Sequence, residues 1–180
     1  MVTTNNRAWA EWMRSYKQFG IGVHDSRLTT SFERIGTNYK LSNIQAAVGL
    51  VQMKHIDELL TKRRELSQRY YRMLEGKRGI LFPKTTLNGT HSWQSCCIFV
   101  ENRNWIMEKL AGRNIETQIG TYSLHMHKAF SQSQACQIAG DMHGSRYVFE
   151  HCLTLPLYHE MTVAEQDYVV SELFEALGES

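Results

Sequence analysis

A short segment ahead of a predicted helix carries residue types that bind anions. Gly36, Asn38 and Lys40 stand at alternate positions in the stretch RIGTNYKLSNIQAAVGLVQ, residues 34–52. The glycine allows close approach to the backbone, the asparagine amide can donate two N–H bonds, and the lysine adds positive charge. The amide hydrogens and dipole of the following helix also favour a negative ligand. The segment predicts a phosphate contact at Asn38, and a simple Gly/Asn turn is the alternative.

The histidines and cysteines do not have the spacing of a metal site. His125 and His127 lie two residues apart, and no carboxylate or cysteine stands close by in the sequence to act as a further metal ligand. The cysteines show no C-x-x-C spacing, and two of them are adjacent in an apolar run. We therefore expect neither a metal nor a disulfide, and we interpret the cysteines as reduced packing residues. They are Cys96, Cys97, Cys136 and Cys152.

Helix signals surround the anion-binding segment. Residues 6–19 are predicted to form an amphipathic helix, and residues 21–36 a loop long enough to be functional. Ser42 and Gln45 form a capping box, after which apolar residues recur at intervals of three, four or seven. We expect one continuous helix from Ser42 to about Glu75, roughly 50 Å long.

Two groups on these helices are interpreted as structural. The run KRRE at residues 62–65 is predicted to be the solvated face of the long helix, with Asp57 and Glu58 as charge partners. Trp9 and Trp12 are interpreted as packing residues.

The rest of the chain alternates short strands with helices. Extended segments are predicted at 80–82, 95–100, 115–119 and 153–158, and a short helix at 105–111. Thr162 and Glu165 form a second capping box, which opens a C-terminal helix. The predicted fold class is α+β, with two or three antiparallel strands and helices packed on them.

Composition excludes several classes of partner. The chain has 180 residues, 42% hydrophobic, which is enough for one core of ordinary size. Its 20 Lys and Arg against 18 Asp and Glu are too balanced for nucleic acid or an anionic membrane to be the main partner. No apolar run approaches the ~18 residues of a membrane span, and the first residues lack the order of a secretory signal. We expect a cytoplasmic protein that binds neither nucleic acid nor membrane.

Four segments, in this order, resemble the C-terminal half of the DegT/DnrJ/StrS family of pyridoxal-phosphate-dependent sugar aminotransferases. They are TNNRAWAEWMRSYKQFG, GTNYKLSNIQAAVGLVQMKHIDELLTKRRELSQRYYRML, IETQIGTYSLHMHKAF and LTLPLYHEMT. The most specific part is the G-x-N-x-K/R-L segment that runs into Q-A-A and a long helix. The resemblance spans nearly the whole chain.

This resemblance implies part of a fold-type-I aminotransferase that assembles as a dimer with active sites at the interface. Residues 1–41 would be the end of the cofactor domain and an interface loop. Residues 42–180 would be the small C-terminal domain, in which a long connecting helix joins a short antiparallel sheet and flanking helices. The asparagine matching Asn38 reaches the phosphate of the cofactor held by the other subunit.

The same resemblance places the reaction's central groups in the half that precedes this chain. These are the Schiff-base lysine, the aspartate that keeps the pyridine nitrogen protonated, and the side chain that stacks on the ring. Neither Lys17 nor Lys40 has the context of the Schiff-base lysine. We therefore expect no catalytic residue here, no covalent hold on pyridoxal phosphate, and no transamination by this chain alone.

The resemblance also implies substrate contacts in the segment around residue 122. Tyr122 and His125 match a Y-x-L-H segment that lines the active-site mouth in the family. The alternative is that His125 and His127, two residues apart, simply occupy one face of an extended edge.

A second set of substrate contacts precedes the strand at 95–100. His91 and Trp93 stand where the family often has a serine or histidine and an aromatic residue facing the sugar nucleotide. For Trp93 the alternative is a core position at the strand entrance. Lys40, with its charge beside Asn38, is also assigned to substrate binding.

The function implied is transfer of an amino group, usually from glutamate, to a keto group on a nucleotide-linked sugar, as in polysaccharide biosynthesis. The expected partners are a second copy of the chain, or the missing N-terminal half, and the nucleotide sugar. The alternative is a non-catalytic binding or dimerisation module derived from the family, which associates through the long helix and exposes apolar surface.

Overall fold

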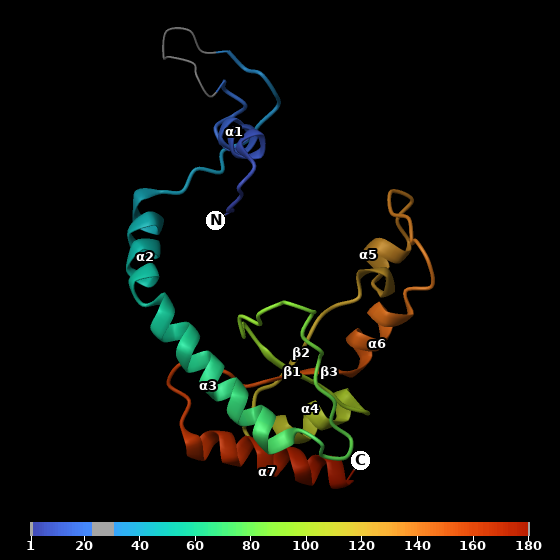
Figure 1. Ribbon diagram of the computed structural model, residues 1–180. Coiled ribbons are helices and arrows are strands. Elements are labelled where there is room, and N and C mark those ends of the chain that lie inside the picture. The colour runs from blue at the N-terminus through green and yellow to red at the C-terminus, as the bar shows by residue number, and fades with distance from the viewer. Residues whose placement is uncertain (1, 23–30, 180) are drawn as a thin grey trace. The chain divides into compact units, whose positions relative to one another are not determined.

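The computed structural model describes residues 2–22 and 31–179, which belong to two compact units. The first unit comprises residues 1–55 and the second residues 56–180. Figure 1 shows the elements of both. Part of the loop predicted for residues 21–36 lies outside the described residues.

Helix α1 spans Arg7–Tyr16 and confirms the first predicted helix. Asn6 caps it, because its side chain accepts a hydrogen bond from the N–H of Trp9 at 3.1 Å. Trp12 stacks on Tyr16 with ring centroids 4.9 Å apart. Trp9 is 63% exposed, so the packing predicted for it is not made with the described residues.

Helix α2 spans Asn43–Lys54 and begins with the predicted capping box. The N–H of Gln45 donates to the Ser42 hydroxyl at 3.3 Å, and the Ser42 N–H donates to the Gln45 side chain at 3.0 Å. Two orphan donors at the start of the helix are thereby satisfied.

The single long helix predicted here is divided at His55. Helix α3 spans Ile56–Leu74. The backbone at His55 leaves the helical conformation (φ −106°, ψ 3°), and its N–H bonds the Gln52 carbonyl three residues back. Asp57 and Glu58 in the first turn of α3 favour a new helix start, because negative charge complements the dipole there. The expectation of one continuous helix is therefore wrong.

A three-stranded antiparallel sheet lies in the second unit, as predicted. Its strands are β1 (Cys96–Phe99), β2 (Gln118–Ile119) and β3 (Cys152–Leu155), in the order β1-β3-β2. The segment predicted as a strand at 80–82 contributes only one isolated bridge, from Leu81 to Phe99. The one predicted at 115–119 is reduced to β2.

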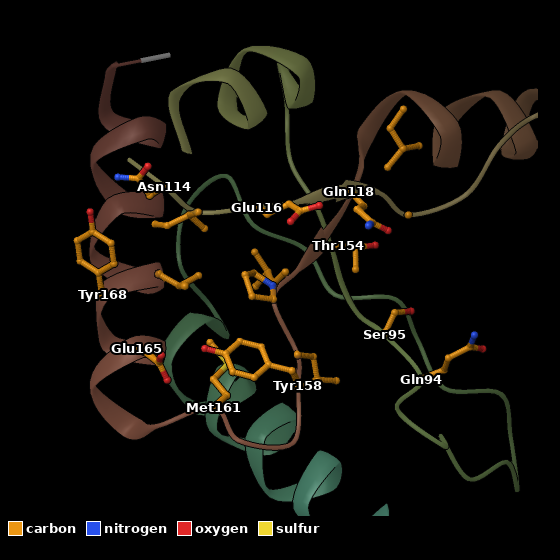
Figure 2. A pocket seen from close by; sticks show the side chains of 17 residues that line it. Gln94, Ser95, Asn114, Glu116, Gln118, Thr154, Tyr158, Met161, Glu165 and Tyr168 are labelled. Atoms are coloured by element: carbon orange, nitrogen blue, oxygen red, sulfur yellow. The ribbon is translucent and has the colours of Figure 1, made fainter. Parts of the chain in front are cut away.

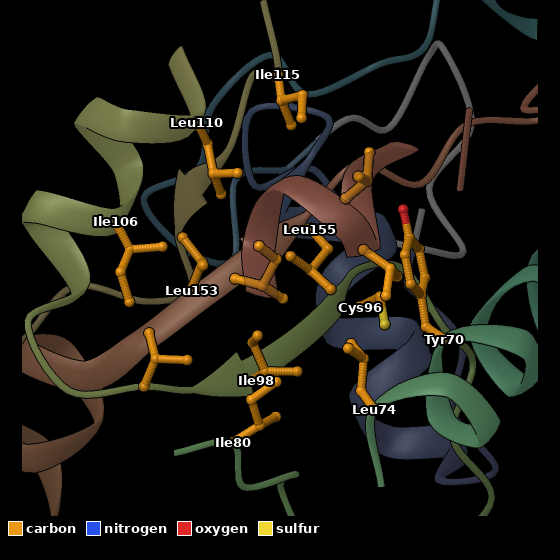
Figure 3. Packing of buried hydrophobic residues seen from close by; sticks show 14 of the residues in the cluster. Tyr70, Leu74, Ile80, Cys96, Ile98, Ile106, Leu110, Ile115, Leu153 and Leu155 are labelled. Carbon is orange, nitrogen blue, oxygen red and sulfur yellow. The ribbon is translucent and has the colours of Figure 1, made fainter. Parts of the chain in front are cut away.

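The core forms where helices cover one face of this sheet. Cys96 and Ile98 of β1 and Leu153 and Leu155 of β3 belong to the core. Helices α3, α4 (Arg103–Ala111) and α7 (Val163–Glu179) complete it. Figure 3 shows the side chains that meet there. They include Tyr70, Leu74, Ile98, Ile106, Leu110, Leu153 and Leu155.

Two polar side chains inside the core, those of Tyr70 and Gln166, donate hydrogen bonds to backbone carbonyls. The Tyr70 hydroxyl donates to the Pro156 carbonyl at 3.1 Å, and burial raises the pKa of Tyr70. The buried Gln166 of α7 donates to the Leu66 carbonyl of α3 at 2.9 Å. These bonds join α3 to α7 and to the chain that leaves β3.

The C-terminal helix starts at the predicted capping box. The N–H and hydroxyl of Thr162 each donate to the Glu165 carboxylate at 2.7 Å, and the Glu165 N–H donates to the Thr162 hydroxyl at 3.2 Å. This second capping-box prediction is confirmed.

Three short elements between β2 and β3 were not predicted. They are the 3₁₀-helix η1 (Leu124–Met126), α5 (Lys128–Ser131) and α6 (His143–His151). None of them contains a buried hydrophobic residue.

All four cysteines are free thiols. Cys96 and Cys152 are buried, and Cys97 is half-buried. Cys136 is exposed, so its interpretation as a packing residue is wrong.

Gly120, which follows β2, gives a prediction about packing. Its N–H donates to the Cys152 carbonyl at 3.0 Å, and a Cβ at this position would lie 2.1 Å from the Cys152 Sγ. Gly120→Ala should therefore lower the free energy of unfolding by about 1–2 kcal/mol, measured by urea denaturation. Gly144→Ala in α6 is the matched control, because nothing lies within 4 Å of a Cβ there.

The double variant Gly120→Ala/Cys152→Ala identifies the cause of that loss. Removing the thiol takes away the closest contact, so part of the stability should return. A Gly120→Ala variant as stable as the native chain, or a loss that persists in full after the thiol is removed, would contradict this account.

Candidate functional site

The segment predicted to bind an anion is held in place by backbone bonds to the end of α1. Thr37 donates to the Tyr16 carbonyl at 2.9 Å, and Asn38 forms an antiparallel bridge with Gln18. A Cβ on Gly36 would lie 2.3 Å from the backbone nitrogen of Gly20, so only glycine fits this close approach. The resulting loop immediately precedes the capped start of α2.

Asn38 and Lys40 are exposed on this loop. The Asn38 side-chain oxygen accepts from the Lys40 N–H at 3.4 Å, which is the contact of an Asn turn. The Lys40 ammonium lies 4.4 Å from the centre of the Phe19 ring. No described residue accepts a bond from the Asn38 NH2 group, so the turn uses the oxygen and leaves the donors for a ligand. Phosphate binding by Asn38 and substrate binding by Lys40 stay predictions.

His91 and Trp93 lie together. Their rings stack with centroids 4.2 Å apart, and the backbone N–H of Trp93 donates to His91 Nδ1 at 2.8 Å. Trp93 is half-buried and meets the Tyr71 ring edge-on at 5.8 Å. Trp93 therefore lies at the margin of the core, with part of its surface open. Substrate contact by this pair stays a prediction.

Arg63 of α3 anchors the segment that carries this pair. Its guanidinium donates to the carbonyls of Trp93 at 2.7 Å and Leu157 at 3.3 Å, and also to that of Gln94. The interpretation of residues 62–65 as a purely solvated face is therefore wrong at Arg63. This arginine ties α3 to the loop before β1 and to the loop after β3.

Tyr122 and His125 stand on a different segment. His125 lies in η1, and its Nδ1 is 2.8 Å from the hydroxyl of the buried Ser123. That hydroxyl is also 2.8 Å from the hydroxyl of Ser145 in α6. The alternative of an extended edge for His125 is therefore wrong, because the chain there forms a 3₁₀ turn.

Tyr122 is 62% exposed. Its ring lies 5.8 Å from His127 and 6.0 Å from Phe149 of α6. Among the described residues, no hydrogen bond or ring contact joins this group to the His91–Trp93 pair. The structure thus places the predicted substrate residues of the second unit in two separate groups.

A cavity of about 810 Å³ lies between the segments that carry these two groups. One side follows directly after Trp93, and another ends at Gly120, two residues before Tyr122. Figure 2 shows polar side chains from both segments and from β3. The polar lining includes Gln94, Ser95, Asn114, Glu116, Gln118 and Thr154.

The charges of this cavity disfavour anionic ligands. Hydrogen bonds from Thr162 lower the pKa of Glu165, so this carboxylate is ionised at neutral pH. Removal from water, together with hydrogen bonding to Glu165, raises the pKa of Tyr158, which stays a protonated donor. Glu116 adds a second carboxylate, and no Lys or Arg belongs to the described lining. The cavity suits hydroxyl groups better than phosphates.

Two other features of the described residues bear on chemistry. No group of three or more His, Cys, Asp or Glu side chains among them could hold a metal ion. None of the helices in the described ranges is long and apolar enough to cross a membrane.

Sequence reasoning missed the polar cavity and Arg63. The Arg63 signal was present, because residue 63 precedes the buried Leu66 and Tyr70 by three and seven positions and so lies on the same helix face. Cavity residues such as Gln118 and Thr154 come together only through strand pairing, which gives no local sequence signal.

The chain is similar to known aminotransferases along nearly its whole length. The family model described as the DegT/DnrJ/EryC1/StrS aminotransferase family matches residues 1–174. An uncharacterized protein of Methanocaldococcus jannaschii is 26% identical over 193 aligned residues, which cover 100% of this chain and 50% of that protein.

Solved structures agree with this similarity. DesV of S. venezuelae, in complex with a ketimine intermediate, has a TM-score of 0.82 and 25% identity, covering 96% of this chain and 45% of its own. A DegT DnrJ EryC1 StrS aminotransferase from Brucella abortus has a TM-score of 0.81 and 24% identity, covering 97% and 45%. The chain therefore spans about half the length of the relatives that it matches.

Proposed function

Since the chain belongs to the DegT/DnrJ/EryC1/StrS aminotransferase family, we propose that it is the C-terminal half of a pyridoxal-phosphate-dependent sugar aminotransferase. The reaction proposed is transfer of an amino group, usually from glutamate, to a keto group on a nucleotide-linked sugar. The observation that carries the proposal is the family match over residues 1–174. The helix-rich fold with its small antiparallel sheet agrees with it.

The loop before α2 fits a role toward the cofactor. Pyridoxal phosphate supplies the electron sink for amino transfer when it is bound. The exposed amide of Asn38 can donate to its phosphate, and the loop's attachment to α1 fixes the position of that amide. Lys40 adds positive charge for a phosphate of the cofactor or of the nucleotide sugar. We propose that the Asn38 amide donates to the phosphate of a cofactor held by another subunit.

The second unit fits a role toward the sugar. Amide and hydroxyl groups line its polar cavity, and hydrogen bonding to sugar hydroxyls is the chemistry that they offer. His91, Trp93, Tyr122 and His125 stand on the segments at its sides. We propose that these four residues contact the substrate at the mouth of the active site.

The exposed face of α2 fits a role in assembly. This helix has no buried residue, and five of its large apolar side chains are more than half exposed. They are Ile44, Val48, Leu50, Val51 and Met53. A helix that is apolar on several sides is normally covered. We propose that α2 packs against a second copy or against the N-terminal half.

A charge on α2 tests this assembly role. Ile44, Val48 and Val51 share one helix face, so Val48→Asp would place a carboxylate in the middle of the proposed contact. We expect the variant to weaken self-association, or association with the N-terminal half, at least about tenfold, measured by analytical ultracentrifugation. Asn43→Asp adds the same charge at an exposed polar position on another side of the helix and is the control. Equal association of Val48→Asp and the native chain would contradict the role of α2.

Reconstitution tests the catalytic proposal. The purified chain would be mixed with an N-terminal half of a family enzyme that carries the Schiff-base lysine, together with pyridoxal phosphate, glutamate and a nucleotide-linked keto sugar. We expect amino transfer only in the mixture, detected as the amino sugar product. A mixture that associates but stays inactive on every nucleotide-linked keto sugar would argue against it.

That last outcome favours a second function. The exposed apolar side chains of α2 also agree with a non-catalytic module that binds an intact aminotransferase subunit. Under this alternative, the chain binds the complete enzyme and adds no activity. Product formation by the mixture of halves distinguishes the two.

A further inference from the structure

Two of the four cysteines lie on the face of the sheet opposite to the core. Cys97 pairs with Thr154 across β1 and β3, and Phe99 pairs with Cys152. Paired residues in antiparallel strands share a face, so Cys97 and Cys152 are diagonal neighbours on it. The two thiols interact with each other, and this interaction is the largest cause of the pKa shift of each.

Hydroxyl groups complete the surroundings of the Cys97 sulfur. Thr154 Oγ1 lies 3.3 Å and Ser95 Oγ 3.5 Å from it, and both hydroxyls can donate to a thiolate. The interaction with Cys152, then the hydrogen bonds from Thr154 and Ser95 and the nearby His91, outweigh burial and lower the pKa of Cys97. The same interaction raises the pKa of Cys152, whose thiol keeps its proton. Cys97 is therefore suited to be the first nucleophile, and Cys152 to attack in a second step.

We propose that Cys97 and Cys152 form a modification site for low-molecular-weight disulfides such as oxidised glutathione. The Cys97 thiolate attacks one sulfur of the reagent, whose S–S bond breaks and releases one thiol after it takes a proton from water. Cys152 then loses its proton to water and attacks the Cys97 sulfur, which releases the second thiol. The protein loses two electrons and gains one disulfide, while the reagent is reduced to two thiols.

The pair is connected to the polar cavity of the second unit. Ser95 and Thr154, which bond the Cys97 sulfur, both line that cavity. Gly120, which also lines it, packs directly against the Cys152 thiol. Oxidation converts the Cys97 thiolate, a good hydrogen-bond acceptor, into a disulfide sulfur, which is a poor one. The redox state of the thiols therefore changes the hydrogen bonding of Ser95 and Thr154 in the cavity wall.

Competition between the cysteines tests the first step. The native chain would be treated briefly with iodoacetamide at about pH 6, where an ordinary thiol is almost fully protonated, and the labelled peptides quantified by mass spectrometry. Cys97 should be labelled at least about tenfold faster than Cys136, although Cys136 is exposed and Cys97 only half-buried. If labelling follows exposure, with Cys136 modified first and Cys97 only after unfolding, the proposal is overturned.

Oxidised glutathione tests the second step. In the native chain we expect an internal disulfide that joins the peptides of Cys97 and Cys152. Cys152→Ser should stop at a glutathione adduct on Cys97, whereas Cys97→Ser should leave Cys152 unmodified. Cys136→Ser should change neither result. An adduct on Cys136 alone, or no internal disulfide in the folded native chain, would reject the paired site; circular dichroism verifies that each serine variant is folded.

Discussion

Replacing Arg63 with alanine should lower the free energy of unfolding by about 2–3 kcal/mol. The guanidinium donates to the carbonyls of Trp93 and Leu157 and to a third carbonyl at Gln94. Hydrogen bonds from a charged donor are stronger than neutral ones, and alanine would leave part-buried carbonyls without their partner. Urea denaturation at fixed pH measures the loss.

Two further variants separate this anchoring from a general effect of charge. Arg63→Lys keeps the charge but loses the planar guanidinium, which reaches several carbonyls at once. Its free energy of unfolding should therefore lie between those of Arg63→Ala and the native chain. Arg64→Ala removes an exposed neighbour on the same helix and should change stability by less than about 0.5 kcal/mol. If Arg63→Ala and Arg64→Ala proved equally mild, the three carbonyl bonds would not contribute to stability as the distances imply.

The anchor also links stability to the candidate site. Arg63 bonds the carbonyl of Trp93, and Trp93 stacks on His91. Loss of the anchor should therefore free these two rings. Increased quenching of tryptophan fluorescence by acrylamide in Arg63→Ala would report that motion. Arg64→Ala is the control, because Trp9, Trp12 and Trp105 contribute a constant background to the fluorescence of both variants.

Local signals were sufficient to predict where two of the helices start. The capping boxes at Ser42 and Thr162 are short-range hydrogen-bond patterns, and both are present. The break at His55 was missed because the apolar spacing continues through it. The acidic pair that starts α3 was interpreted as charge partners of the solvated face rather than as a helix start.

Partnerships across the fold could not be predicted in the same way. The sheet order β1-β3-β2 places Cys97 beside Cys152 and brings Gln118 opposite Thr154. Cys97 and Cys152 are separated by 55 positions in the sequence (152 − 97), and Gln118 and Thr154 by 36 (154 − 118). They become neighbours only through strand pairing. The polar cavity and the thiol pair depend on those pairings. The loop at Asn38 could be proposed as an anion site from the sequence because its candidate groups all lie within residues 36–40.

Asn38→Ala should weaken retention of pyridoxal phosphate in the reconstituted enzyme by about 1–3 kcal/mol, or roughly 5- to 150-fold. Alanine removes the two amide donors proposed to reach the phosphate. The backbone bridge to Gln18 remains, and the side-chain oxygen gives up only a 3.4 Å contact with the Lys40 N–H. The free energy of unfolding of the chain should therefore change by less than about 0.5 kcal/mol. Equilibrium dialysis of the cofactor and urea denaturation measure the two effects.

Ser42→Ala is the matched control for Asn38→Ala, because it changes the same loop and helix start without touching the proposed donors. It removes one half of the capping box and should destabilise the start of α2 by about 1 kcal/mol, with only an indirect effect on the cofactor. The two variants should thus have opposite profiles, one in binding and one in stability. If Asn38→Ala instead lowers the melting temperature of the chain and leaves cofactor retention unchanged, the asparagine serves the turn. The bond that its oxygen accepts from the Lys40 N–H would then be the contact that matters.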